Sequence, residues 1–413
     1  MLILVGASQG TSDSRKEVTA REVLAKIEQD MPANYDDRII KGDLDLSTID
    51  LDKNDDGKYI VKSQININNS EIQGKVGFNR TSFQESASFK NTTFSDNVYF
   101  DESEFIGGAI FKLAQFNSDA TFFIATFDGD NADFKDAKFG NEADFGGAEF
   151  KTIADFRVAR FSGEALFSSG ANFIGDARFD STRFSGCSTF EEATFGGNDT
   201  SFREAKFSGE ADFEKADFSG KADFEETTFN SDVEFLHVDF NDSCNFYEAQ
   251  FNKTANFSDS IFNKIANFEK AQFMDDVYFR YAKFNKTSDF INAKFHKDAD
   301  FRTTQFNETV TFEEAEFGGY ALFEGANFSN TSKLCLNRTQ CEKKIRLKWK
   351  SIEGDNNLPI VMWDDENSKL IFDEEAYLTL YKNYRDLGWF EDASQTAHPA
   401  ASSGACSRRS SAI

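Results

Sequence analysis

The sequence has few of the residues from which catalytic and metal sites are built. Its 413 residues include only 3 His, and no Cys and His stand at zinc-binding spacing. It also lacks a glycine-rich phosphate loop and any Ser or Cys nucleophile signature. His237 and His296 follow Phe235 and Phe295 at positions expected to face water, and His398 lies in the tail. The sequence therefore predicts a protein that is not an enzyme, with no cofactor except a possible calcium ion discussed below.

Basic residues are outnumbered by acidic ones. There are 45 Lys and Arg against 71 Asp and Glu, which gives a net charge of −26 and a pI near 4.6. This balance argues against direct binding to nucleic acid, which needs clustered basic side chains. The acidity predicts a soluble, self-repelling surface.

Phenylalanine is the abundant residue, with 49 copies against 3 Pro, 3 Trp and 4 Met. From Phe78 to Phe328, 46 of them keep one register, with gaps that alternate between five and six and three slips of one residue. In a helix this spacing would distribute the Phe side chains around the whole circumference. In a flat strand, Phe residues five apart would point to opposite faces and those six apart to the same face. A coil that turns a corner every five or six residues places every Phe inside, which predicts a solenoid. A central part of this core ladder is Phe213, Phe218, Phe224, Phe229, Phe235, Phe240, Phe246 and Phe251.

The alternation also predicts the number of sides. Five-residue sides stack on five-residue sides only if the number of sides is even, and four sides give a coil of about 22 residues. A column of Asn side chains that can hydrogen-bond from coil to coil recurs at this spacing: Asn241, Asn263, Asn285 and Asn307. The Phe segment alone predicts eleven to twelve coils and a rod about 55 Å long.

The units "ADFEK", "ADFSG" and "ADFEE", which begin at Ala211, Ala216 and Ala222, resemble the pentapeptide-repeat family. The resemblance implies a right-handed quadrilateral β-helix, an all-β solenoid. The sixth residue in alternate units departs from the family unit and is similar to a Phe-rich branch, including archaeal proteins from methanogens. Some family members mimic DNA and inhibit type II topoisomerases.

The two ends depart from the Phe pattern. Upstream, Thr19 and Glu22 predict a capped helix over the first coil, and the register continues in aliphatic residues: Ile40, Leu46, Leu51, Val61, Ile67 and Ile72. Downstream, Asp373 and Gly388 bound the first helix of a predicted hairpin. The expected organisation is a leader or disordered segment (1–16), a capping helix (17–32), the β-helix (33–333), a connector (334–372), the helical hairpin (373–397) and a disordered tail (398–413).

Asp52, Asn54 and Asp56, followed by Gly57, match the first half of a calcium-binding loop. The twelfth position is Ser63 instead of the bidentate Glu, so a plain acidic turn between two coils is the alternative.

Cys335 and Cys341 bracket a short loop and could form a disulfide in an exported protein, although free thiols are equally compatible with the spacing. Cys187, Cys244 and Cys406 have no evident partners.

Twelve Asn-x-Ser/Thr sequons favour an extracellular or membrane-associated location, with the cytoplasm as the alternative. The sequence begins MLILVGASQG, which resembles the tail of a signal peptide or a frayed terminus. Similar archaeal proteins continue into membrane-spanning helices after the hairpin, whereas the tail here has no apolar run of spanning length.

The sequence thus favours a non-catalytic scaffold, a rigid acidic rod that presents a surface to an unknown protein partner at or outside the cell membrane. The alternative is a DNA mimic that binds or inhibits a type II topoisomerase. The oligomeric state is not predicted.

Overall fold

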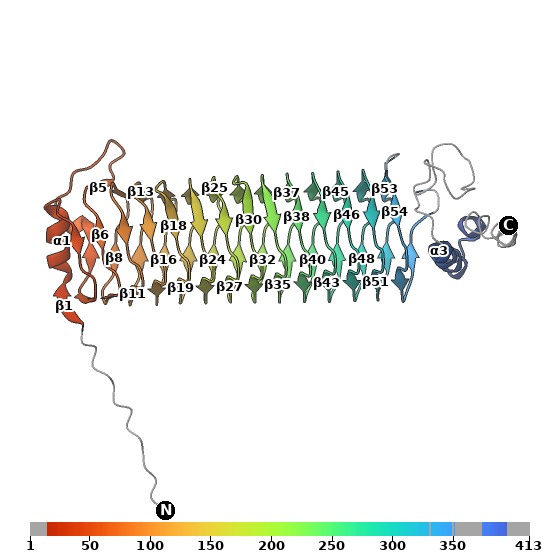
Figure 1. Ribbon diagram of the computed structural model, residues 1–413, viewed down its shortest axis with the longest axis horizontal. Coiled ribbons are helices and arrows are strands. Elements are labelled where there is room, and N and C mark those ends of the chain that lie inside the picture. The colour runs from red at the N-terminus through yellow and green to blue at the C-terminus, as the bar shows by residue number, and fades with distance from the viewer. Residues whose placement is uncertain (1–14, 330–331, 349–350, 352–373, 395–413) are drawn as a thin grey trace, which may run out of the picture.

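The computed structural model describes residues 15–329, 332–348, 351 and 374–394, and these form a long parallel solenoid with a helix near each end (Figure 1). Four parallel sheets run along the rod, and each strand pairs with the strand one coil before and one coil after it. We name them sheets A to D, with 15, 14, 14 and 13 strands: A from β1 (Lys16–Thr19) to β55 (Gln340–Cys341), B from β2 (Ala33–Asn34) to β54 (Leu334–Cys335), C from β4 (Leu44–Asp45) to β56 (Ile345–Arg346), and D from β5 (Tyr59–Val61) to β53 (Asn327–Phe328). The predicted quadrilateral β-helix is confirmed.

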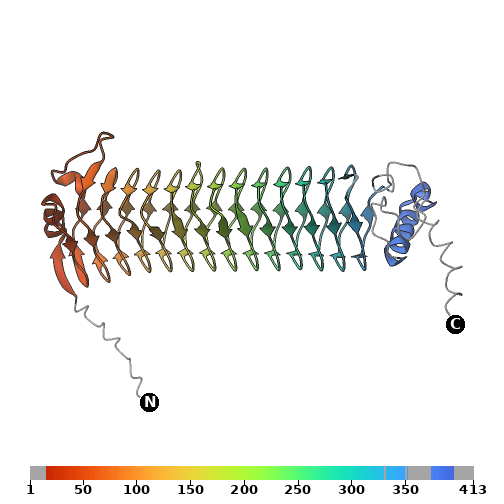
Figure 2. The ribbon, with the colours of Figure 1, turned by 45° about the horizontal axis from the view of Figure 1, so that its top comes forward.

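One coil from the middle of the rod shows the repeating unit (Figure 2). Its strands are β30 (Asp199–Ser201) in sheet B, β31 (Lys206–Phe207) in A, β32 (Ala211–Asp212) in C and β33 (Asp217–Phe218) in D. In β31 and β33 the Phe is the second strand residue. In sheets B and C the Phe directly follows the strand, and a small buried residue, here Thr200 or Ala211, stands two positions before it. The four sides are therefore of two alternating kinds.

The alternation of two kinds of side accounts for the alternating gaps of five and six residues between successive Phe. Each corner with a five-residue gap places the second residue after the Phe in the left-handed region, as at Glu204 (φ 55°), Lys215 (φ 58°) and Glu226 (φ 56°). This conformation tightens the turn, at a cost of roughly 1–2 kcal/mol for a residue other than glycine. At the six-residue corners the second residue after the Phe is not in the left-handed region, except between Phe167 and Phe173, where Ser169 has φ 58°. Like corners stack on like corners, so one conformation recurs along each edge.

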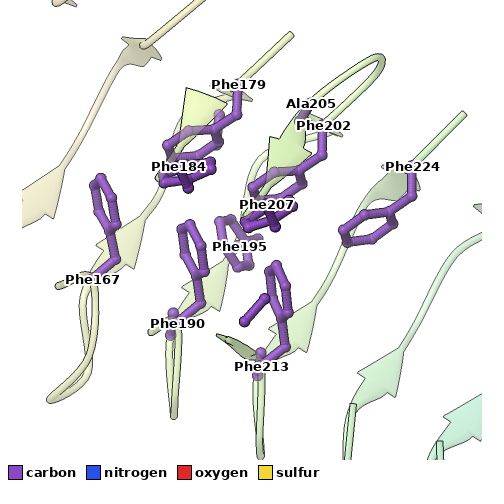
Figure 3. Packing of buried hydrophobic residues seen from close by; sticks show 14 of the residues in the cluster. Phe167, Phe179, Phe184, Phe190, Phe195, Phe202, Ala205, Phe207, Phe213 and Phe224 are labelled. Atoms are coloured by element: carbon purple, nitrogen blue, oxygen red, sulfur yellow. The ribbon is translucent and has the colours of Figure 1, made fainter. Parts of the chain in front are cut away.

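The rings fill the interior in columns (Figure 3). Phe207 is buried and stacks on Phe184 and Phe229 in the neighbouring coils, with ring centroids 4.6 and 4.9 Å away. Across the tube, Phe202 of sheet B meets Phe213 of sheet C edge to face at 5.5 Å and 88°. Each ring therefore gains both offset stacking along its column and edge contacts between columns.

The β-helix is longer than its Phe segment. Ile72 pairs with Ile40, and Val61 pairs with Phe83, so aliphatic residues occupy the Phe columns in the first coils. At the far end Leu336 and Leu347 are buried in the same way, next to β54 and β56. The predicted boundary at 333 is therefore wrong, because apolar residues other than Phe continue the core as far as Leu347.

The N-terminal cap is a strand and a helix together. β1 pairs with β3 (Arg38–Lys41) and extends sheet A before α1 (Ala20–Glu28) begins. Thr19 is the N-cap, as predicted, and its Oγ1 accepts a hydrogen bond from the Glu22 amide at 3.3 Å. The helix is shorter than the predicted 17–32 because its first residues pair as a strand. Val23, Leu24 and Ile27 bury one face of α1 on the first coil.

A single-turn 3₁₀ helix, η1 (Leu46–Thr48), precedes the acidic loop in the first coil. Asn34 pairs with Asn66, 32 residues further on, and sheets A and C make the same step across this loop. From β5 onward every step between coils is 22 to 24 residues. The predicted interruption after Leu51 is therefore an enlarged corner of one coil.

At the C-terminal end, α3 (Glu374–Leu387) is followed by helical residues 390–394, and Gly388 between them has φ 74°. The Asn383 amide accepts a hydrogen bond from Ile345 N at 3.0 Å and donates one to Ile345 O at 2.7 Å. This side chain takes the place of a further coil at the edge of sheet C. The predicted Asp373 cap, the leader as far as residue 14, most of the connector and the tail lie outside the described residues.

Candidate interaction surface

Outward side chains recur once per coil and form columns along the rod. The Asn column on sheet D is a hydrogen-bonded ladder in which each Nδ2 donates to the Oδ1 one coil earlier. The distances are 3.0 Å from Asn263 to Asn241, 2.8 Å from Asn285 to Asn263 and 2.8 Å from Asn307 to Asn285. The structure brings the four predicted residues together.

Further Asn ladders lie on other faces and were missed from the sequence. Asn252 donates to Asn230 at 2.9 Å, and Asn267 donates to Asn245 at 3.0 Å. Both pairs keep the 22-residue spacing, so a column-by-column inspection of the sequence could have found them.

Replacing Asn263 by Ala should lower the free energy of unfolding by about 1 kcal/mol, because the amides above and below each lose one partner. Thermal unfolding of the purified chain measures this loss. Asn198→Ala is the matched control, because Asn198 is exposed and no hydrogen bond of its side chain occurs within the described residues. Equal shifts for the two variants would show that the ladder does not stabilise the rod.

The residues of the predicted calcium loop have other partners. The Asp52 carboxylate lies 2.6 Å from Lys62 Nζ, and the Asn54 side-chain oxygen accepts hydrogen bonds from Asp56 N and Lys58 N at 3.1 and 2.9 Å. Nowhere in the described part of the chain do three or more His, Cys, Asp or Glu side chains gather at a metal-binding distance. The geometry matches the acidic turn that the sequence left as the alternative.

The predicted disulfide between Cys335 and Cys341 is wrong, since both are free thiols. Cys335 pairs with the outward residue Thr311, whereas Cys341 pairs with Phe317 and occupies the inward Phe column. The two side chains lie on different sheets and on opposite sides of the wall. Burial raises the pKa of the Cys341 thiol to about 11. Cys187 is exposed, Cys244 is buried, and Cys406 lies outside the described residues.

A shallow groove of about 870 Å³ runs along the corner between sheets B and A, from Ser181 to Glu316. Its walls carry both charges in successive coils, among them Arg183, Glu204, Lys206 and Glu248. His237 and His296 are exposed on the rod and are not among its lining residues. The groove is open and polar, and it follows the rod.

Carboxylates stacked on sheets B and C have perturbed pKa values. Partial burial raises the pKa of Asp133, Asp144 and Asp289. Burial also opposes the ionisation of Asp300, but hydrogen bonds from Arg302 and Arg280 outweigh it and lower its pKa. The Arg302 Nη2–Asp300 Oδ2 distance is 2.6 Å. These Arg–Asp contacts hold outward side chains in place on adjacent coils.

The chain should become more stable as the pH falls from 7 toward the ordinary carboxylate pKa of 3.8. Asp133, Asp144 and Asp289 bind a proton more readily in the folded chain, so their protonation favours the folded state. Their ionisation therefore lowers the free energy of unfolding increasingly as the pH rises through the folded pKa. The rise should reverse when Asp300, whose pKa is lowered, begins to protonate. Melting temperature against pH tests this, with Asp144→Asn flattening the upper part of the curve. A melting temperature that falls steadily below pH 7 would contradict it.

The repeat segment is the part of the chain that is similar to known proteins. A family model described as pentapeptide repeats, in nine copies, matches residues 78–123, 169–217, 197–239, 213–261, 235–283 and 246–293. The chain carries a pentapeptide-repeat β-helix. No curated protein and no solved structure matches it, so the similarity to archaeal proteins rests on no relative.

The pentapeptide-repeat β-helix continues where the family model does not match. Residues 124–168 contain the extra residue between Phe127 and Phe134, yet strands β17 (Thr126–Phe127) and β21 (Glu149–Phe150) pair in register across it. The fold is a structural one, generally without catalytic activity. Among the helices that the structure describes, none is long and apolar enough to cross a membrane.

Proposed function

We propose that the chain is a non-catalytic scaffold whose outer faces bind a partner protein, with sheet A and its groove as the main contact surface. The groove between Ser181 and Glu316 carries the proposal, because it presents charged side chains of both signs from successive coils on a rigid support. Each coil is stabilised by contacts with its two neighbours, so the spacing of these side chains stays constant along the rod. A partner would be recognised by several weak contacts in register.

We further propose that the scaffold acts outside the cell or at the membrane, which the sequons favour. Several sequon Asn side chains are committed to contacts between coils, including Asn241, Asn285 and Asn307. Asn198 and Asn327 are exposed instead and are the expected glycan acceptors. Cell fractionation with sequencing of the mature N-terminus tests the location. An unprocessed cytoplasmic protein would refute it.

Affinity capture tests the contact surface. The full chain is compared with a variant that changes Thr228, Gln250 and Gln272 in the groove to Glu, and with a control that changes Thr194, Ser219 and Gln305 on sheet D to Glu. A partner held by the wild type and the control but lost by the groove variant supports the scaffold. A partner lost equally by both variants, or no partner at all, counts against it.

The DNA-mimic alternative requires a different distribution of charge on the surface. It needs an acidic face without basic residues, but Lys138, Arg160 and Lys206 are exposed on sheet A. A supercoiling assay with a type II topoisomerase separates the two functions. Strong inhibition by the purified chain would overturn the scaffold proposal.

A further inference from the structure

The outer face of sheet A has three columns of residues. In β19 (Lys138–Phe139) these are the strand residue before the Phe, Lys138; the residue after it, Gly140; and the residue three after it, Glu142, at the corner with sheet C. We call them the leading, middle and trailing columns. Strand alternation turns the leading and middle residues away from the core, and the trailing residue stands at the turn.

The charges of the leading and trailing columns are complementary. From β7 (Glu71–Ile72) to β55, no coil has the same charge in both columns. Five coils have opposite charges: Glu71 with Lys75, Lys138 with Glu142, Arg160 with Glu164, Lys206 with Glu210, and Lys294 with Asp298. The leading residue is acidic at Glu71, where the trailing residue is the basic Lys75, and at Glu316, where it is the uncharged Tyr320.

The middle column is uncharged over most of its length. From Gln73 to Gly318 it contains only polar or small side chains, Met274 and His296. In the four coils whose leading residues are Lys138, Arg160, Arg183 and Lys206, the middle residues are small, namely Gly140, Ser162, Ser185 and Ser208. This part of the face can therefore be approached closely.

Sheet D provides a comparison within the same molecule. Its middle column includes Asp128 and Lys151, and its corresponding outer columns hold one opposite pair, Asp217 with Lys221. The pattern on sheet A is thus not a general consequence of the repeat.

The central charges of sheet A lack ion pairs within the part of the chain that the structure describes. Lys138, Arg160 and Lys206 form no ion pair with any described residue, and neither do Glu142, Glu164 and Glu210. Lys138, Arg160, Arg183 and Lys206 occupy four successive coils, so like charges stack at about 4.8 Å, which is unfavourable. In the trailing row, burial and the carboxylates of Asp119, Asp144 and Glu164 raise the pKa of Glu142.

A second copy of the chain can place opposite charges against the leading and the trailing column at the same time. A two-fold axis parallel to the rod, in front of sheet A, places each leading residue opposite the trailing residue of the same coil in the partner, and each middle residue opposite itself. A two-fold axis across the rod would instead place leading residues opposite leading residues, which are basic in four coils. An extended peptide repeats its side chains every 6.6–6.8 Å on one face, so it does not match the spacing of about 4.8 Å.

We propose that two copies associate side by side through sheet A, with their rods parallel and their coils in register. The proposal rests on the proposed function, in that it identifies the partner of sheet A as another copy. Thirteen coils, with a contact about 10 Å wide, bury roughly 600 Å² per copy, at the low end for a stable interface. The dimer should therefore be weak and should depend on its charges.

Charge reversal provides the first test, by sedimentation velocity of the full chain in about 0.15 M salt. An acidic variant carries K138E, R160E and K206E, and a basic variant carries E142K, E164K and E210K. Each should raise the dimer dissociation constant by about 100-fold, because both rows then have the same sign. An equal mixture of the two should form a heterodimer. The basic variant is less negative overall than the wild type, so its dissociation could not come from net charge.

Disulfide trapping provides the second test and reports the symmetry. Ser185 lies in the middle column, so S185C, with Cys187 and Cys406 changed to Ser, should cross-link to itself under mild oxidation. S219C in the same background is the matched control, since Ser219 is an exposed serine that follows a Phe on sheet D. Faster covalent dimer formation by S185C than by S219C is the expected result.

Several outcomes would overturn the proposal: a monomeric wild type at about 100 µM, a mixture of charge variants that stays monomeric, or equal cross-linking of S185C and S219C. Binding of an acidic protein or polysaccharide to the leading row of a monomeric chain would also overturn it. In these cases a partner lost by the groove variant would still support the scaffold, so failure of the dimer and failure of the scaffold can be told apart.

Discussion

Deleting one complete coil, residues 208–229, should shorten the rod and leave it folded, whereas deleting the single side 213–217 should disrupt it. The first deletion brings Asn230 to the position of Ser208 and keeps every column in register. The second moves all later residues by one side, so five-residue corners stack on six-residue corners. Each lost ladder bond costs about 1 kcal/mol. Each residue forced into the left-handed region costs roughly 1–2 kcal/mol. The expected loss is on the order of 5 kcal/mol.

Deletion of half a coil, residues 208–218, is the informative control. It should also fold, because sheets B and C have the same kind of side, as do sheets A and D. The rod beyond the deletion would be turned by half a revolution. Circular dichroism, chemical unfolding and small-angle scattering report folding and length for the three variants. Equal stability of the variants lacking 213–217 and 208–229 would contradict the requirement that like corners stack.

Phe207→Ala should lower the free energy of unfolding by about 3–5 kcal/mol, because it leaves a cavity in a packed interior. The ring is buried and stacks at 4.6 and 4.9 Å on Phe184 and Phe229, so both neighbours lose contact area. Since each coil is supported mainly by the coils beside it, the loss should be concentrated around β31. Hydrogen exchange should show the largest loss of protection there and in the two adjacent coils.

Phe123→Ala is the matched control for this substitution. Phe123 is outside the register and 40% exposed at a corner, and its ring lies near the Gly146 backbone. Its replacement should cost less than about 1 kcal/mol. If the two variants were destabilised equally, the ring columns would not be the main source of stability.

The sequence did not reveal most of the contacts between outward side chains, and particular residues show why. The Asn column was recognisable because identical residues recur at 22-residue spacing. The complementary columns of sheet A were not, because Lys, Arg, Gln, Thr and Glu share the leading positions and no residue type continues beyond two successive coils. Only when β19, β23 (Arg160–Phe161) and β31 are seen stacked does the charge pattern emerge.

The ends were the least predictable part. Ile40, Val61 and Leu336 continue the core with shapes different from Phe, and a boundary drawn where Phe stops came too early. Asn383 reaches a strand edge 38 residues away in the sequence, which no local pattern reveals.

The spacing of one bulky apolar residue sufficed to determine a four-sided tube, because a ring must be buried at every side and only an even number of sides stacks like on like. The conformation of each corner, the partner of each outward side chain and the closing of both ends were decided by the tertiary structure alone. Those features depend on which residues meet across neighbouring coils, 22 or more positions apart. At that distance a single sequence specifies the spacing of residues but not their contacts.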